Sequence, residues 1–251
     1  MVIARSRFQG VVNILRFNWH FYVGAILLLC GLLFASDYLV QPLQTLVYLA
    51  ICISIITIAV SLLVSYYVYD YSKIYDLKWI ADADHSDILN INAGFDETTD
   101  ILRHKFPNAR ITSCDFYNEH KHTEISIKRA RLAYPPADDV IKTETCLLPF
   151  ADNSFNKVLA IFSAHEIRND EERVAFFKEL CRVTKPSGQI LVTEHLRDIS
   201  NFLAYTVGFM HFFSKESWKD TFRKSHLNIV EEIKTTAFVT TFILVKNGAA
   251  H

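Results

Sequence analysis

Residues 157–194 read KVLAIFSAHEIRNDEERVAFFKELCRVTKPSGQILVTE and contain the pattern of one βαβ unit. Two short apolar runs, 157–162 and 189–194, have the length and composition of buried strands. Between them, apolar residues recur at helical spacing over 170–183, which predicts an amphipathic helix. The sequence KPSG at 185–188 predicts the turn into the second strand. A strand, a helix and a strand in this order predict neighbouring parallel strands of one sheet.

The same alternation continues on both sides of this unit. Further strands are predicted at 87–92, 110–115, 140–145, 229–233 and 237–245. Only a short turn separates the last two, so they are expected to form an antiparallel hairpin. The fold class is therefore α/β, with a Rossmann-like, mostly parallel sheet that ends in an antiparallel pair. In such sheets, ligands bind beyond the carboxyl ends of the strands.

The first seventy residues predict a hairpin of two transmembrane helices. Hydrophobic residues make up 51% of the chain, and most of the excess precedes Tyr69. Residues 21–35 and 43–69 carry no charge, and with aromatic flanks both approach or exceed the ~20 residues that cross a bilayer. A cleaved signal peptide and a pair of soluble core helices are alternatives that the length of the second segment disfavours. We expect a membrane anchor over 1–80 and a catalytic domain over 81–251.

Charge indicates the orientation and limits the partners. Arg5, Arg7 and Arg16 precede the first apolar segment, Lys73 and Lys78 follow the second, and no Lys or Arg lies between them. Positive residues favour the cytosolic side, so both termini and the α/β domain are expected in the cytosol. The net charge of -1 argues against a nucleic-acid partner.

Two motifs carry a resemblance to a known family. Residues 148–158, LPFADNSFNKV, resemble the signature LPFpDnsFD, and residues 179–188, ELCRVTKPSG, resemble ELxRVLKPGG. Both signatures occur in small-molecule methyltransferases, a family that includes the ubiquinone and menaquinone C-methyltransferases. The resemblance covers roughly residues 86–246, and both motifs occur in the usual order. It implies a class I methyltransferase fold with S-adenosylmethionine as the cofactor.

The cofactor loop departs from the family pattern. The family has D-x-G-x-G-x-G, whereas residues 90–96 read NINAGFD and keep only the middle glycine, Gly94. Glycine serves there because it takes positive φ and lets the backbone approach the ligand. Asn92 is a tolerable substitute, since Asn enters the left-handed region more readily than most residues. We expect Asp96 or Thr98 to cap the following helix and the loop to bind the cofactor in an altered way.

The resemblance also implies where the rest of the cofactor lies. Asp115 ends the second strand, where an acidic side chain accepts hydrogen bonds from both ribose hydroxyls. Glu144 matches the acidic residue that meets the adenine amino group, and Phe116 is expected to pack on the adenine. An Asp at a strand end is otherwise a common turn residue. The implied cofactor-binding set is Asn90, Asn92, Gly94, Asp115, Phe116, Glu144, Thr145 and Ser163.

The candidate catalytic residues follow two strands that should be neighbours in the sheet. Methyl transfer requires an aligned acceptor, exclusion of water and, for a weakly acidic acceptor, removal of a proton. His165 and Glu166 follow the fourth strand, and His195 follows the fifth. We predict that His165 is the general base or orients the acceptor, because a histidine titrates near neutral pH. His195 and Glu166 are the next candidates.

Another group of titratable residues raises the question of a metal site. His120, His122 and Glu124 would share one face of an extended strand. The segment is instead expected to be a loop that enters a helix, with Thr123 as its cap. The sequence therefore predicts no metal site.

Residues 201–213, NFLAYTVGFMHFF, bear on the acceptor. The segment is apolar and aromatic, and it is too short to span a bilayer. We expect an interfacial helix through which a hydrophobic acceptor enters from lipid. An ordinary helix packed on the sheet is the alternative.

The leading functional hypothesis is methylation, at oxygen or carbon, of a lipophilic acceptor in the membrane, such as a quinone or phenolic lipid. A catalytically inactive methyltransferase-fold scaffold at the membrane is the alternative, which the altered glycine loop favours. A lipid-binding or transport accessory protein is a third class, disfavoured because the spans carry no charge. The sequence leaves the acceptor, the methylated atom and the oligomeric state open.

Overall fold

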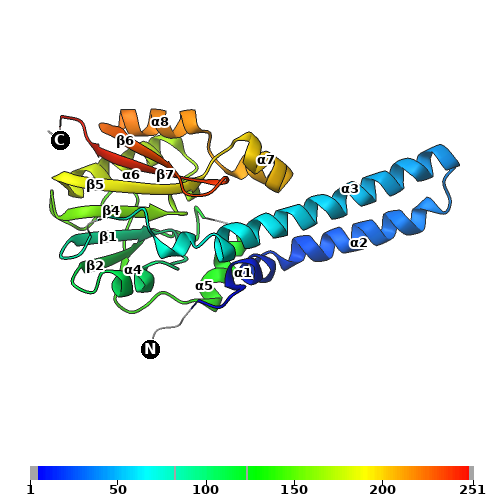
Figure 1. Cartoon of the computed structure of the whole chain (residues 1–251), viewed down its shortest axis with the longest axis horizontal. Helices are drawn as coiled ribbons and strands as arrows, with labels where there is room; N and C mark the ends of the chain where they lie inside the picture. The colour runs from blue at the N-terminus through cyan, green and yellow to red at the C-terminus, as the bar shows by residue number, and fades with distance from the viewer. Residues whose placement is uncertain (1–4, 82, 123, 249–251) are drawn as a thin grey trace.

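The computed structural model describes residues 5–81, 83–122 and 124–248, and it shows a sheet domain with a long helical hairpin at one end (Figure 1). Thr123, the expected cap, lies outside the described residues. The helices are α1 Gln9–Phe17, α2 Trp19–Ser36, α3 Gln41–Tyr66, α4 Thr99–Lys105, α5 Ile125–Ala133, α6 Asp170–Val183, α7 Ile199–Tyr205 and α8 Lys215–Lys224. The short helical turns are η1 Tyr67–Tyr71, η2 Ile74–Asp76, η3 Ala164–Glu166 and η4 Thr206–His211. The strands are β1 Asp87–Asn92, β2 Arg110–Asp115, β3 Ile141–Lys142, β4 Phe155–Ile161, β5 Thr184–His195, β6 Leu227–Lys234 and β7 Val239–Lys246.

The strands form one sheet in the order β3-β2-β1-β4-β5-β7-β6. β1 to β5 are parallel, whereas β7 is antiparallel to both β5 and β6. The predicted fold, a mostly parallel sheet with a terminal antiparallel pair, is confirmed. Asn92 pairs with Asp115, so β1 and β2 end level with one another at the carboxyl edge. This edge is where a parallel α/β sheet binds its ligands.

The predicted turn at 185–188 is wrong, because these residues belong to β5. Thr184 pairs with Phe155, and the register then shifts before Gln189 pairs with Lys157. The irregularity brings the strands close at Gly188, where a Cβ would lie 2.8 Å from the carbonyl oxygen of Asn156. Residues 185–188, whose composition is typical of a turn, thus form part of a strand with a bulge.

Each face of the sheet carries its own apolar core. Successive strand residues point to opposite faces, so Leu89 packs toward α6 and α8, whereas its neighbour Ile88 packs toward α4. The second core also contains Leu77 and Ile80, from the segment that joins the helical hairpin to β1. The end of the hairpin is therefore fixed within the core of the sheet domain.

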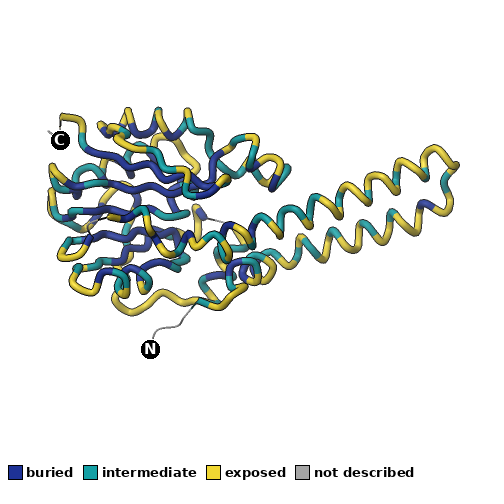
Figure 2. Tube along the Cα trace, in the orientation of Figure 1, coloured by how far each residue is buried: buried dark blue, intermediate teal, exposed yellow. Residues whose placement is uncertain are grey.

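Helices α2 and α3 form the projecting hairpin. Both are long and apolar enough to cross a membrane, and only 6% and 0% of the residues in their apolar windows are buried. Figure 2 shows this exposure along nearly the whole hairpin, in contrast to the dark strands of the sheet. The hairpin starts at the carboxyl edge of the sheet, where η1 continues α3.

A short helix that the sequence analysis did not predict, α1, locks the base of the hairpin. The Asp70 carboxylate, in η1, accepts hydrogen bonds from the backbone N–H groups of Gly10 (2.7 Å) and Val11 (2.9 Å). These N–H groups belong to the first turn of α1 and have no partner within the helix. Gly10 also allows α1 to approach closely, since a Cβ there would collide with the Cβ of Tyr69.

Asp70→Ala is expected to lower the free energy of unfolding by about 1–2 kcal/mol, the usual cost of losing a helix cap. In a protein of this size that loss corresponds to a fall in Tm of about 2–8 °C. Thermal unfolding in detergent micelles measures it, with Asp138→Ala, at an exposed residue, as the matched control. Equal Tm values for the two variants would show that the Asp70 cap does not stabilise the fold.

Candidate active site

Three of the cavities in the described part of the chain lie at the carboxyl edge of the sheet. The inner cavity, of about 140 Å³, is lined by the loop after β1, the end of β4 and Tyr75 of the joining segment. The outer cavity, of about 380 Å³, is lined by Gly94, Asp115 and the region between α5 and β3. The side cavity, of about 180 Å³, lies beside Phe116 and Glu144. Phe95 lines both the inner and the outer cavity and lies between them.

In the loop after β1, the residues that differ from the family pattern have side chains that form hydrogen bonds within the loop and with the start of α4. The Asp96 carboxylate accepts hydrogen bonds from the backbone N–H groups of Thr98 and Thr99, both at 2.9 Å. Asp96 therefore caps the start of α4, as predicted, and its side chain does not fill the crevice. The Asn90 amide donates to the hydroxyls of the same two threonines, at 2.9 and 2.8 Å. Asn90 is thus buried inside the loop and points away from the cavities.

Asn92 and Gly94 shape the part of the loop that faces the cavities. Gly94 has a φ of +99°, the conformation for which a glycine was predicted. Its N–H donates to the side-chain oxygen of Asn92 (3.0 Å), whose amide donates to the carbonyl oxygen of Cys114 (3.0 Å). Asn92 lines the inner and outer cavities and remains in contact with the space that a cofactor would fill.

Aromatic and charged groups from the N-terminal region line one side of the crevice. The Phe95 ring packs against Phe17 of α1 and against Tyr134, with centroids 5.7 and 5.4 Å apart. Glu97 accepts hydrogen bonds from Arg5 (2.5 Å) and from the Tyr75 hydroxyl (2.7 Å). The base of the hairpin therefore forms one wall of the predicted cofactor site.

The carboxylate predicted to hold the ribose already has a cationic partner. Asp115 is 3% exposed, accepts a hydrogen bond from the Tyr117 N–H (2.8 Å) and forms an ion pair with Arg131 of α5. The Arg131 guanidinium lies 4.5 Å from the centroid of the Tyr117 ring and also donates to the Gly94 carbonyl (3.3 Å). Arg131 therefore competes with a ribose for the Asp115 carboxylate.

The remaining predicted cofactor residues are spread over the edge. Phe116 borders the side cavity but packs into the core against Phe176. Glu144 is exposed in that cavity, and Thr145 is buried and donates to Glu172. Ser163 is buried and donates to the carbonyl oxygen of Ile91 (2.9 Å), so it ties the loop after β4 to β1.

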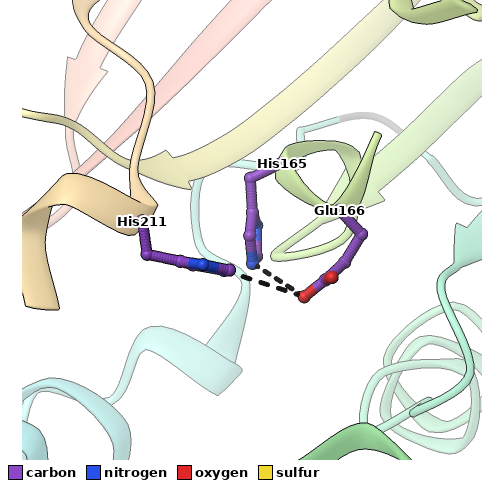
Figure 3. Close-up of side chains that lie close together, drawn as sticks. All are labelled: His165, Glu166 and His211. Carbon is purple, nitrogen blue, oxygen red and sulfur yellow. Dashed lines mark ion pairs between the residues drawn. The ribbon is translucent and has the colours of Figure 1, made fainter. Parts of the chain in front are cut away.

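His165 and Glu166, two of the predicted catalytic residues, lie together in η3 at the end of β4 (Figure 3). Nδ1 of His165 lies 2.7 Å from the buried Glu194 carboxylate, and its Nε2 lies 3.2 Å from Oε1 of Glu166. Burial alone would lower the pKa of His165, but the two carboxylates outweigh burial and hold it well above its usual value. Glu166 also lines the inner cavity.

His211, at the end of η4, was missed by the sequence analysis, which saw residues 201–213 only as an apolar segment. Its Nδ1 lies 3.2 Å from Oε1 of Glu124, and its Nε2 lies 3.9 Å from the same Glu166 oxygen that faces His165. His165, Glu166 and His211 each offer a ligand atom within 4.8 Å of the others, a group able to hold a metal ion. The group does not include His120 or His122, the histidines that the sequence analysis weighed as metal ligands.

His195 lies apart from this group. Its Nδ1 bonds with the Asn201 side-chain oxygen (3.0 Å), and its Nε2 bonds with the Tyr69 hydroxyl (2.8 Å). The ring is stacked between Phe162 and Phe212, with centroids 5.5 and 4.8 Å away. Burial lowers the pKa of His195 to about 4. With both nitrogens occupied, the ring joins η1 to the end of β5, and it is not among the residues that line the inner cavity.

The stability of the fold is expected to depend on this neutral histidine below pH 6.5. An unfolded chain protonates His195 near its ordinary pKa of about 6.5, whereas the folded chain resists protonation until about pH 4. The stabilisation is therefore complete above pH 6.5 and is lost as the pH falls toward 4. The stability advantage of the wild type over His195→Gln should shrink by about 2 kcal/mol between pH 7 and pH 5. Chemical unfolding of both proteins at the two pH values measures it, and an unchanged difference would contradict the neutral state.

Residues 89–192 match the family described as a methyltransferase domain. The ubiquinone/menaquinone biosynthesis C-methyltransferase of Paracoccus denitrificans is 27% identical over 123 residues, which cover 47% of this chain and 46% of that protein. The demethylmenaquinone methyltransferase of Renibacterium salmoninarum is 39% identical over 59 residues, which cover 24% of each chain. The chain thus matches less than half the length of these curated relatives.

Solved structures show the same fold. A chain in the complex between the Haloferax volcanii Trm112 methyltransferase activator and a methyltransferase has a TM-score of 0.51 at 15% identity, over 70% of this chain and 88% of that one. A protein of Pyrococcus horikoshii OT3 has a TM-score of 0.50 at 16% identity, over 68% and 85%. At such identities, the likeness is one of fold.

Proposed function

We propose that this chain, whose sheet domain is a class I methyltransferase domain, transfers a methyl group from S-adenosylmethionine to a lipophilic small molecule drawn from the membrane. The inner cavity carries the proposal. Its walls include Asn92 and Phe95 of the cofactor loop, Glu166, and Tyr75, which follows the apolar hairpin directly. The position expected for methyl transfer therefore lies at the base of the proposed membrane anchor.

The exposed apolar surface supports a position against a bilayer. Helices α2 and α3 have the length and composition of membrane spans. Beside the base of α3, helix α7 and the turn η4 expose Ile199 (77%), Leu203 (67%) and Val207 (80%). Exposed apolar side chains at helical spacing are typical of an interfacial segment. We infer that the hairpin spans the membrane, that both termini are cytosolic, and that α7 and η4 lie in the interface.

The residues at the carboxyl edge can accommodate the cofactor once Arg131 releases Asp115. Asp115 then offers a carboxylate to the ribose, and the positive φ of Gly94 keeps the loop backbone close. Glu144 borders the neighbouring side cavity, as expected for the adenine end. When bound, S-adenosylmethionine supplies a methyl group on a positively charged sulfur.

The residues around the inner cavity would act on the acceptor. Glu166 presents a carboxylate to the cavity and can accept a proton from an acceptor hydroxyl. His165, held by Glu194 on one nitrogen, fixes the position of Glu166 with the other. Phe95, Ile127 and Phe162 provide apolar walls that exclude water and suit a quinone or phenolic ring. His195 positions the joining segment through Tyr69.

A scaffold without catalytic activity is the second candidate function. The ion pair between Asp115 and Arg131 favours it, because Arg131 occupies an oxygen that the ribose would use, and so does the loss of two glycines from the cofactor loop. Cofactor binding separates the two candidates directly.

The wild type is expected to bind S-adenosylmethionine or its demethylated product in a calorimetric titration of the detergent-solubilised chain. Asp115→Ala should weaken binding about 10–100-fold, because charge-assisted hydrogen bonds to the ribose are worth about 1.5–3 kcal/mol. Arg131→Met should strengthen it several-fold, because it frees the carboxylate but keeps an apolar side chain over Tyr117. An absence of heat at millimolar ligand in all three proteins would favour the scaffold.

Entry from lipid is tested by the double variant Leu203→Glu/Val207→Glu. Charges on this surface should lower turnover of a long-chain phenolic or quinol acceptor in vesicles at least fivefold, since desolvating a carboxylate in the interface is costly. Turnover of a short-chain, water-soluble analogue should be retained. Val230→Glu, on the edge strand β6, is the matched control. Equal losses for both acceptors would show that the surface does not deliver the substrate.

A further inference from the structure

We propose that His165, Glu166 and His211 form a binding site for one divalent transition-metal ion at the edge of the inner cavity. The site goes beyond methyl transfer, and the binding of an ion to it needs neither cofactor nor acceptor. The three side chains come from the loop after β4 and from the end of η4, and only the fold brings them together (Figure 3).

The three ligand atoms converge on one point. Nε2 of His165 and Nε2 of His211 lie 3.2 and 3.9 Å from the same carboxylate oxygen of Glu166, and all three atoms lie within 4.8 Å of one another. A metal ion with bonds of about 2.1 Å holds its ligand atoms about 3–4 Å apart. Small rotations of the side chains are enough to reach that spacing.

A carboxylate lies behind each imidazole, hydrogen-bonded to His165 and at ion-pair distance from His211. Nδ1 of His165 lies 2.7 Å from Glu194, and Nδ1 of His211 lies 3.2 Å from Glu124. Metal-bound histidines usually donate their second ring N–H to a carboxylate or carbonyl, which fixes the tautomer and aims the other nitrogen at the metal. His165 has this arrangement through its hydrogen bond to Glu194, and Glu124 lies at the corresponding nitrogen of His211.

The backbone around the cluster is also fixed. The Arg168 guanidinium donates to the carbonyl oxygens of His165 (3.2 Å) and His211 (2.6 Å), so it clamps the two loops that carry the ligands. Three carboxylates, those of Glu124, Glu166 and Glu194, lie around the two rings.

The donor set indicates the kind of ion. Two imidazoles and one carboxylate suit Zn²⁺ and other late first-row ions, whereas Mg²⁺ and Ca²⁺ prefer oxygen ligands alone. Three protein ligands leave at least one coordination position free, as in catalytic zinc sites. Because Glu166 lines the inner cavity, that position would face an acceptor oxygen. A bound ion would lower the pKa of that hydroxyl, a consequence that does rest on the proposed function.

The test is a titration of the full chain in detergent with Zn²⁺ after chelator treatment, followed by calorimetry, and a parallel titration with Co²⁺, followed by its visible absorption. We expect one ion per chain. His211→Ala should weaken binding at least 100-fold, and Glu194→Gln about 10–100-fold, the usual cost of losing a carboxylate behind a ligand. His120→Ala, at an exposed histidine, is the matched control and should leave the affinity unchanged.

A further variant guards against loss of folding. His211→Cys keeps a metal ligand, so it should retain Zn²⁺ binding and add a thiolate-to-cobalt absorption band. Substoichiometric binding by the wild type, or an affinity unchanged by His211→Ala, would overturn the proposal. No cofactor is present in this titration and no metal in the cofactor titration, so either proposal can fail while the other stands.

Discussion

The hydrogen bond between the Tyr69 hydroxyl and Nε2 of His195 joins the two parts of the molecule. Tyr69 continues the helix α3, and His195 ends the strand β5. The bond is partly buried and lies among aromatic rings, which limit its contact with water. Because it lies at the carboxyl edge of the sheet, the apolar hairpin leaves the domain on the side where ligands bind. The segments on either side of the hairpin contribute Tyr75 to the inner cavity and Arg5 to the outer cavity.

The cofactor loop departs from the family pattern in its side chains, although the fold around it is that of the family. Asp96 and Asn90 replace two residues of the family pattern, yet their side chains bond within the loop and to the start of α4. Phe95 takes a place on the crevice wall because α1 supplies an aromatic partner. These substitutions are consistent with one another, since each new side chain is satisfied by a neighbour that the family pattern does not require.

More charged side chains are buried at the carboxyl edge than the packing of the sheet requires. Asp115 is compensated by Arg131, and Glu97 by Arg5. Around His165, the carboxylates of Glu166 and Glu194 both face one imidazole, whereas the nearby Arg168 guanidinium donates to backbone carbonyl oxygens. Grouping carboxylates in this way is costly inside a protein, so the group points to chemistry rather than to stability.

The sequence by itself determined the sheet, its antiparallel end and the apolar hairpin, because these depend on local periodicity and on the length of apolar runs. It also limited the cap of α4 to Asp96 or Thr98 and indicated that Gly94 needs positive φ, since both are properties of a few consecutive residues. Tertiary structure alone decided that Arg131 forms an ion pair with Asp115, that Tyr69 forms a hydrogen bond with His195 and that His211 lies beside His165. These contacts link residues 16, 126 and 46 positions apart. No local pattern encodes them, because they depend on which loops the sheet order brings to one edge.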